Sequence, residues 1–175
     1  MASSLDILKQ ILDREMEMPK NRIWAYNANI DLPKDNNLFI ILSYGERTPY
    51  SNTIKYKNTA NGLEEVQSMS VKEDVIISLL SKSTQARDRA HEVLFALNST
   101  YSKTLQQQNK IHITNIGEVY DASFLEATSR INRFDVRCSI FKAYTKSKSV
   151  DYYDKYSFEV WTGEPNGSVK DKFEV

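Results

Sequence analysis

The sequence predicts an α/β fold of the α+β type: a mainly antiparallel β-sheet with a central helix packed on one face and a second helix at the N-terminus. Three observations carry this prediction. Residues 84–108 place apolar side chains at steps of three and four, which is the period of an amphipathic helix. The runs on either side, 64–80 and 131–145, alternate apolar and polar residues, as half-buried strands do.

Each of these runs has one apolar side. The apolar stripe of the central helix consists of Ala86, Ala90, Val93, Leu94, Leu97, Tyr101 and Leu105. The apolar parity of the preceding strand is Met69, Val71, Val75, Ile77 and Leu79, and Glu73 is its one exception. The apolar parity of the following strand is Phe134, Val136, Cys138, Ile140 and Tyr144. We expect these surfaces to meet in one core.

The N-terminal part of the chain predicts a helix and a buried strand. Residues 3–16 have helical spacing, with Ser3 or Ser4 in position to cap the first turn. Pro19 ends this helix, because proline disfavours helical geometry in the residue before it. The continuous apolar run 38–42 predicts a buried strand.

The remaining segments give weaker patterns. The polar stretch 46–62 predicts a long loop or a partly ordered hairpin arm. A short strand is expected at 111–114, and a brief helix at 121–130, where Ser123 and Glu126 have capping-box spacing.

The C-terminal part predicts a strand and a tail. The alternating run 152–160 predicts a last strand, which the short turn 146–149 joins to 131–145 as an antiparallel hairpin. We therefore expect one domain over 1–161 and a flexible tail over 162–175.

Composition narrows the classes of function. The 23 Lys and Arg residues balance 23 Asp and Glu residues, so the whole chain lacks the basic excess of a nucleic-acid-binding protein. Cys138 is the only cysteine, which excludes an internal disulfide. The N-terminus shows no signal-peptide pattern and no apolar run reaches the ~20 residues that span a bilayer. We expect synthesis in the cytosol and no membrane association.

No catalytic, metal or cofactor site is expected. His91, His112 and Cys138 offer a base and a thiol, but their spacing matches no nucleophile or zinc pattern. A thiol enzyme using Cys138 therefore stays an alternative hypothesis. Neighbours in a strand point to opposite faces, so neither acidic pair, at 64–65 or at 73–74, is expected to converge on a substrate. We expect both pairs on solvated strand positions.

A second alternative is a small nucleic-acid-binding module. Tyrosines and lysines gather near the predicted C-terminal hairpin, and such a surface stacks on single-stranded bases. These residues are Tyr144, Tyr152, Tyr153 and Tyr156, with Lys142, Lys146 and Lys148. Asp151 and Asp154 cancel much of this charge, and tyrosine is also enriched at protein–protein contacts. We favour a core and interface role for the tyrosines.

Residues 85–99 resemble the central helix of the neck or tail-terminator-like proteins of tailed bacteriophages, and the resemblance continues in 126–135 and 152–154. Together with the order of elements, it covers roughly 38–161. It implies a non-enzymatic structural virion protein, made in the host bacterial cytoplasm, that closes into a ring, usually of six copies. Such a ring sits at the head-proximal end of the tail tube and stops tube polymerisation. It also joins the tail to neck, head-completion or connector proteins, and double-stranded DNA passes through its lumen without specific binding.

A ring contact needs two different complementary patches on each subunit, because it is heterologous. The outer parity of the strand 131–145 alternates in charge, and the polar stretch 46–62 is a second candidate for a contact with the neighbour, the tube or the neck. The interface residues expected from these two regions are Arg130, Arg133, Asp135, Arg137, Tyr44, Arg47 and Tyr50.

Overall fold

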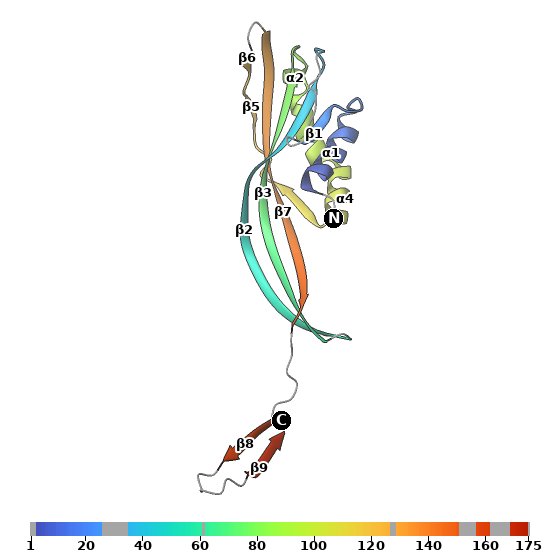
Figure 1. Ribbon diagram of the computed structural model, residues 1–175. Coiled ribbons are helices and arrows are strands. Elements are labelled where there is room, and N and C mark those ends of the chain that lie inside the picture. The colour runs from blue at the N-terminus through green and yellow to red at the C-terminus, as the bar shows by residue number, and fades with distance from the viewer. Residues whose placement is uncertain are drawn as a thin grey trace. The chain divides into compact units, whose positions relative to one another are not determined.

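The computed structural model describes residues 3–25, 35–60, 62–126, 129–150, 157–161 and 169–174, and over these residues the fold is α+β (Figure 1). The predicted fold class is therefore confirmed. The chain divides into two compact units. Unit 1 comprises Met1–Asn52 and Ser68–Tyr144, and unit 2 comprises Thr53–Gln67 and Thr145–Val175. This division runs through the stretch 1–161 that we expected to form one domain.

The N-terminal helix α1 (Ser4–Glu15) begins where the sequence predicts. The hydroxyl oxygen of Ser3 accepts a hydrogen bond from the backbone N–H of Asp6, and the Asp6 carboxylate accepts one from the Ser3 backbone, each at 3.1 Å. This capping box satisfies two amide groups that a helix start leaves without partners. The inner side of α1 is fully buried at Leu8, Ile11 and Leu12.

The predicted central helix is divided into three helices. They are α2 (Gln85–Asp88), α3 (Ala90–Asn98) and α4 (Thr100–Asn109). The second break is at Ser99, which is extended and accepts a hydrogen bond from the Ser102 backbone at 3.0 Å. Ser99 therefore caps a new helix, where the helical period alone predicts an uninterrupted one. The predicted stripe is nevertheless confirmed, with Val93 and Leu97 buried at its centre.

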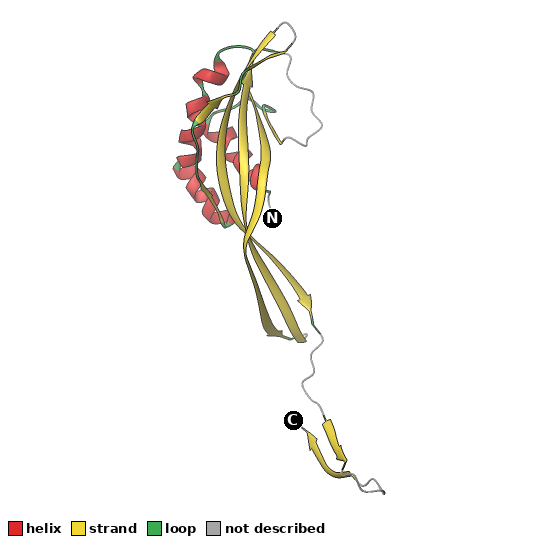
Figure 2. Ribbon diagram, turned by 90° about the vertical axis from the view of Figure 1, so that its left-hand side faces the viewer, coloured by secondary structure: helices red, strands yellow, loops and turns green. Residues whose placement is uncertain are grey.

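The main sheet has the strand order β1-β2-β3-β7-β4 among the described residues. These strands are β1 (Ile23–Ala25), β2 (Phe39–Thr59), β3 (Gly62–Ser81), β4 (Ile111–Thr114) and β7 (Ser129–Ser149). Strand β1 is parallel to β2, and β4 is antiparallel to β7. In unit 1 the helices cover one face of this sheet, as Figure 2 shows.

Two short strands replace the predicted helix over 121–130. Strands β5 (Val119–Asp121) and β6 (Phe124–Glu126) pair antiparallel with β7. Ser123 does not cap a helix; its backbone N–H donates to the Asp121 carboxylate at 2.9 Å and turns the chain between the two strands. The capping-box spacing was therefore misleading, because pairing with β7 satisfies the backbone instead.

Over its described residues, the stretch 46–62 forms a β-hairpin and not a loop. We use the word arm for the parts of β2, β3 and β7 that belong to unit 2. Strand β2 runs unbroken to Thr59 and β3 begins at Gly62. The last residue of β1 pairs with Leu42, so beyond that point β3 is the only strand that the described residues place beside β2. An edge strand tolerates Pro49, and exposure of the arm accounts for its polar sequence.

The C-terminal strands pair with each other. Strand β8 (Ser157–Trp161) is antiparallel to β9 (Val169–Glu174). The predicted hairpin between 131–145 and 152–160 is therefore wrong, because the described strand β8 pairs with β9 and not with β7. Residues 151–156 lie outside the described part. The predicted tail also contains a strand, because β9 supplies the backbone partners that β8 needs.

The core belongs to unit 1. Among residues whose burial is described, every buried apolar side chain lies in unit 1, and most come from its helices and strands. In unit 2, by contrast, Ile54 and Tyr56 are 52% and 60% exposed. The arm formed by β2, β3 and β7 in unit 2 has no apolar core within the described residues.

Two leucines on α3 test this core. We expect Leu97→Ala to lower the free energy of unfolding by roughly 2–5 kcal/mol, because Leu97 is buried and its loss leaves a cavity. Leu94→Ala is the matched control, since Leu94 is only partly buried and should cost clearly less. Denaturant unfolding measures both, and equal losses would contradict the burial of the predicted stripe.

Candidate functional site

A buried carboxylate joins four elements of unit 1. Glu73 on β3 is 1% exposed. Its carboxylate accepts hydrogen bonds from the Ser4 hydroxyl at 2.5 Å and from the Tyr144 hydroxyl at 2.8 Å. The Arg47 Nε lies 3.4 Å from the same carboxylate. Because an unpaired buried charge is costly, these three groups from α1, β7 and β2 are what allows Glu73 to be buried.

Two residues predicted as interface candidates belong to this cluster. The Arg47 guanidinium lies 3.8 Å from the centre of the Tyr44 ring, which is cation–π distance. Tyr44 and Arg47 have opposite parity in β2, so simple strand alternation does not predict this contact. The structure therefore brings them together, and it engages both within the chain. The side chain of Arg47 remains half exposed.

Glu73 was expected on a solvated strand position, and that expectation is wrong. The signal was present in the sequence, since Glu73 is the one charged residue on the apolar parity of its strand. Its partners Ser4 and Tyr144 are distant in sequence, so spacing alone does not identify them. The expectation that Glu73 and Asp74 point to opposite faces agrees with their different partners.

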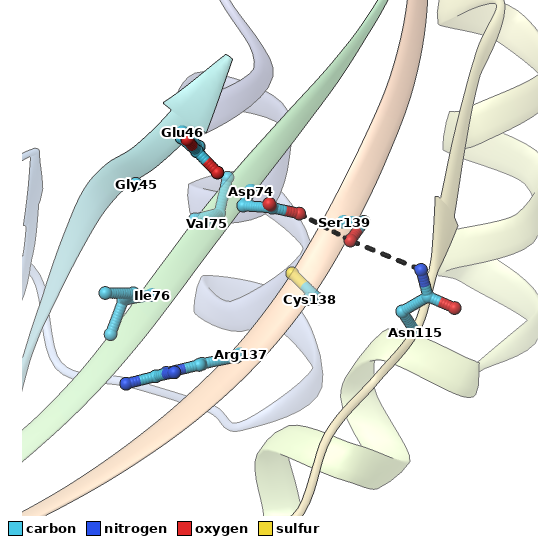
Figure 3. Close-up of a pocket in the computed structure, with 9 residues that line it drawn as sticks. All are labelled: Gly45, Glu46, Asp74, Val75, Ile76, Asn115, Arg137, Cys138 and Ser139. Carbon is cyan, nitrogen blue, oxygen red and sulfur yellow. Dashed lines mark hydrogen bonds between the residues drawn. The ribbon is translucent and has the colours of Figure 1, made fainter. Parts of the chain in front are cut away.

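Asp74 belongs to a cavity of about 460 Å³ (Figure 3). The Ser139 hydroxyl donates to the Asp74 carboxylate at 2.6 Å, and Lys72 Nζ lies 3.0 Å from it. These contacts hold the pKa of Asp74 below its usual value, chiefly through Ser139 and then through Lys72. Asn115 donates to the Ser139 hydroxyl at 3.4 Å, so the polar groups of this wall bond to one another.

Cys138 also lines this cavity, but it is poorly suited to be a nucleophile. Burial, and then the Asp74 charge, raise the pKa of the thiol to about 12, so the reactive thiolate is scarce at neutral pH. Neither His91 nor His112 is among the residues that line the cavity. His91 is exposed on α3 and lies edge-to-face with Phe95. Neither histidine therefore lies beside the thiol that the alternative enzyme would use.

Some of the charged side chains on the outer parity of β7 have partners within the chain. Arg133 donates two hydrogen bonds to the Asp135 carboxylate, at 2.9 and 3.0 Å, and a third to the Ser78 hydroxyl at 3.2 Å. Arg137, by contrast, is exposed at the cavity, and the described residues place no carboxylate within ion-pair distance of it. Arg130 lies in β7, but its side chain is outside the described part.

Tyr50 stands on the arm-forming strand β2 and is largely exposed. Its ring lies edge-to-face with Phe141 of β7, with ring centres 5.5 Å apart. Among the predicted interface residues whose side chains are described, Arg137 and Tyr50 are exposed and take part in no ion pair within the described residues. Arginine and tyrosine are also residue types enriched at protein contacts.

Comparison of the sequence with models of known protein families and with curated proteins finds no match. In the described part of the chain, no helix is long and apolar enough to cross a bilayer. The same residues contain no group of three or more potential metal ligands.

Tyr144 tests the Glu73 cluster. We expect Tyr144→Phe to cost about 1–3 kcal/mol of unfolding free energy, because a buried carboxylate loses a donor. Tyr120→Phe is the matched control and should change little, because both tyrosines are exposed but the described residues give only the Tyr144 hydroxyl a hydrogen-bond partner. Burial, and then the hydrogen bond to Glu73, raise the pKa of Tyr144 to about 12 from a usual value of 10.

The folded protein therefore holds the Tyr144 proton more tightly than the unfolded chain. Its contribution to stability is complete below pH 10 and is lost as the pH rises towards 12. Chemical unfolding at several pH values should show that the difference in unfolding free energy between the wild type and Tyr144→Phe becomes smaller between pH 10 and pH 12. Cys138 titrates in both proteins and cancels in the comparison. A difference in unfolding free energy that does not change with pH would contradict the hydrogen bond between Tyr144 and Glu73.

Proposed function

We propose that this chain is a structural subunit of the tail or neck of a tailed bacteriophage, forming a ring at the head-proximal end of the tail tube. There it would stop tube polymerisation and join the tail to the neck or connector proteins. The role is non-enzymatic and places the protein in the virion. The proposal begins from the resemblance of residues 85–99 and 126–135 to tail-terminator-like proteins.

The observation that carries the proposal is the arm of unit 2. A sheet normally buries one of its faces, and small isolated sheets are marginally stable in water. The unit 2 parts of β2, β3 and β7 contribute no residue to the described core, and Ile54 and Tyr56 are more than half exposed. Such a sheet gains most of its stability when another molecule covers it, which is the behaviour of an assembly subunit.

The uncovered surface of unit 1 supports the same reading. Arg137 and Tyr50 present exposed side chains on the unit 1 parts of β7 and β2. In the proposed ring these residues contact a neighbouring subunit, the tail tube protein or a neck protein. DNA passes through the lumen and is not specifically bound, in keeping with the zero net charge of the chain.

The second candidate, a nucleic-acid-binding module, has less support. Its surface relied on Tyr144, whose hydroxyl is engaged by Glu73. It also relied on Tyr152, Tyr153 and Tyr156, which lie outside the described residues. Lys148, a further member, forms an ion pair with Glu65 at 3.0 Å. A steep dependence of single-stranded DNA binding on salt would favour this function over the ring.

The proposal is tested by solution mass and by images of the same sample. Light scattering over a range of concentrations should show a species of about six subunits, and negative-stain images should show rings with a central hole. The purified chain should also cap and shorten tubes of the tail tube protein from the same phage. A monomer that neither forms rings nor limits tube length would contradict the proposed function.

Arg137 supplies a point test of the interface. We expect Arg137→Glu to weaken ring formation without changing the unfolding midpoint, because its guanidinium is exposed and has no acidic partner among the described residues. Lys103→Glu, at an exposed site on α4, is the charge-matched control. Arg133 is a poor probe, since reversing it would place a carboxylate beside Asp135. Unchanged assembly in Arg137→Glu would remove this face from the interface.

A further inference from the structure

The β2–β3 end of the arm in unit 2 has exposed positive charge on one face of β2 and exposed apolar side chains on the other. Lys55 and Lys57 are exposed on β2, and they alternate with Ile54 and Tyr56. The nearby acidic Glu65 is already engaged, by Lys148 at 3.0 Å and by the Tyr56 hydroxyl at 3.3 Å. The described residues place no carboxylate within ion-pair distance of Lys55 or Lys57. We name residues 54–57 the arm patch.

Unit 1 has a groove of the opposite charge. It has a volume of about 330 Å³ and lies where the C-terminal end of α1 meets α3. Its apolar member Phe95 is 72% exposed, the highest value among the large hydrophobic side chains whose exposure is described. We name it the Phe95 groove, and it is lined by Glu15, Met16, Glu17, Arg89, Glu92 and Phe95.

The charges of the Phe95 groove do not cancel. Three carboxylates face one guanidinium, and Arg89 is fully engaged by Glu92 at 2.6 Å and by the Met16 carbonyl at 2.5 Å. Glu15 and Glu17 are exposed, and the described residues give neither of them an ion-pair partner. The C-terminal end of α1 adds the negative end of its helix dipole. Arg89 shows that this end of α1 accepts a cation.

We propose that the arm patch of one copy of this chain docks into the Phe95 groove of a second copy. The free edge of β2 would enter the groove, because β3 is its only described neighbour there. Lys55 and Lys57 on one face of the strand would then meet Glu15 and Glu17, while Ile54 and Tyr56 on the opposite face would cover Phe95. Opposite charges steer such an encounter and fix its register, and the exposed apolar side chains supply its centre. Both surfaces combine one sign of charge with exposed apolar groups, and this complementarity is the argument for a second copy as the occupant.

The contact is heterologous, because the two surfaces are different. Each copy therefore offers one arm patch and one groove, and repetition gives either a closed ring or an open filament. This inference rests on the proposed function and deepens it, by naming the two complementary patches that ring formation requires.

The test reverses the charge of each surface in the full chain and measures mass by light scattering. We expect Lys55→Glu/Lys57→Glu and Glu15→Lys/Glu17→Lys each to raise the concentration needed for half-assembly about tenfold or more. Lys82→Glu/Lys103→Glu reverses an exposed pair elsewhere and should leave assembly unchanged. Unfolding curves check that each variant is folded.

Mixing the variants gives the decisive comparison. Equal amounts of Lys55→Glu/Lys57→Glu and Glu15→Lys/Glu17→Lys restore complementary charge at every contact of an even-numbered ring, so assembly should return. Suppose that the wild type forms rings. This contact would then be overturned if either reversed variant assembled as well as the wild type, or if mixing the two variants did not restore assembly. Either result would leave the ring function intact. A wild-type chain that stays monomeric would overturn a second copy as the occupant. The capping of tubes then decides the proposed function separately.

Discussion

The burial of Glu73 is the constraint on which the rest of unit 1 depends. A carboxylate inside a protein is tolerated only when its charge is paired and its oxygens accept hydrogen bonds. The partners of Glu73 come from the start of α1, from β2 and from β7, so its burial requires all three elements to be in place at once. An apolar side chain at this position would pack without such demands. The charge therefore specifies how the first helix sits against the sheet, beyond what apolar packing requires.

The two units differ in how they are stabilised. Unit 1 buries apolar side chains of four helices against one face of the sheet, with Glu73 at the edge of that core. The arm of unit 2 is held by strand pairing and by contacts such as the ion pair between the exposed Lys148 and the largely covered Glu65. Strands β2, β3 and β7 continue from unit 1, which has an apolar core, into unit 2, where the described part of the arm has none. We propose that a partner molecule supplies the missing apolar contacts. The proposed assembly would cover the exposed apolar residues of the arm.

Much of unit 1 could be predicted because its signals are local or periodic. The capping box at Ser3 and Asp6, the stripe through Val93 and Leu97, and the alternation around Val136 and Ile140 each follow from spacing. The break at Ser99 was missed because a serine that caps one helix looks the same as a polar residue within another. For residues 46–62 the sequence predicts either a long loop or a partly ordered hairpin arm. It does not decide between them, because an exposed edge strand lacks the alternation of apolar and polar residues that marks a half-buried strand.

The candidate site was harder to predict than the fold. Arg137 and Tyr50 are exposed as expected, but Arg133 pairs with Asp135, and Tyr44 and Arg47 join the Glu73 cluster. Arg133 and Asp135 lie on one parity of β7, and Tyr44 and Arg47 both lie on β2. The contacts of Glu73 with Arg47 and Tyr144, by contrast, join different strands, whose register the sequence does not specify. The Phe95 groove also depends on tertiary structure, since Glu15 and Phe95 are brought together by the packing of α1 on α3.

Hydrogen–deuterium exchange in dilute and in assembled samples tests the central claim most directly. If a partner completes the arm, backbone amides of residues 54–57 and 63–66 should exchange rapidly in dilute solution and become protected on assembly. Amides of the unit 1 core strands, such as those of Ile40 and Ile77, should be protected in both samples. An arm as strongly protected as the core in a dilute monomer would show that it is stable alone, and would contradict the account.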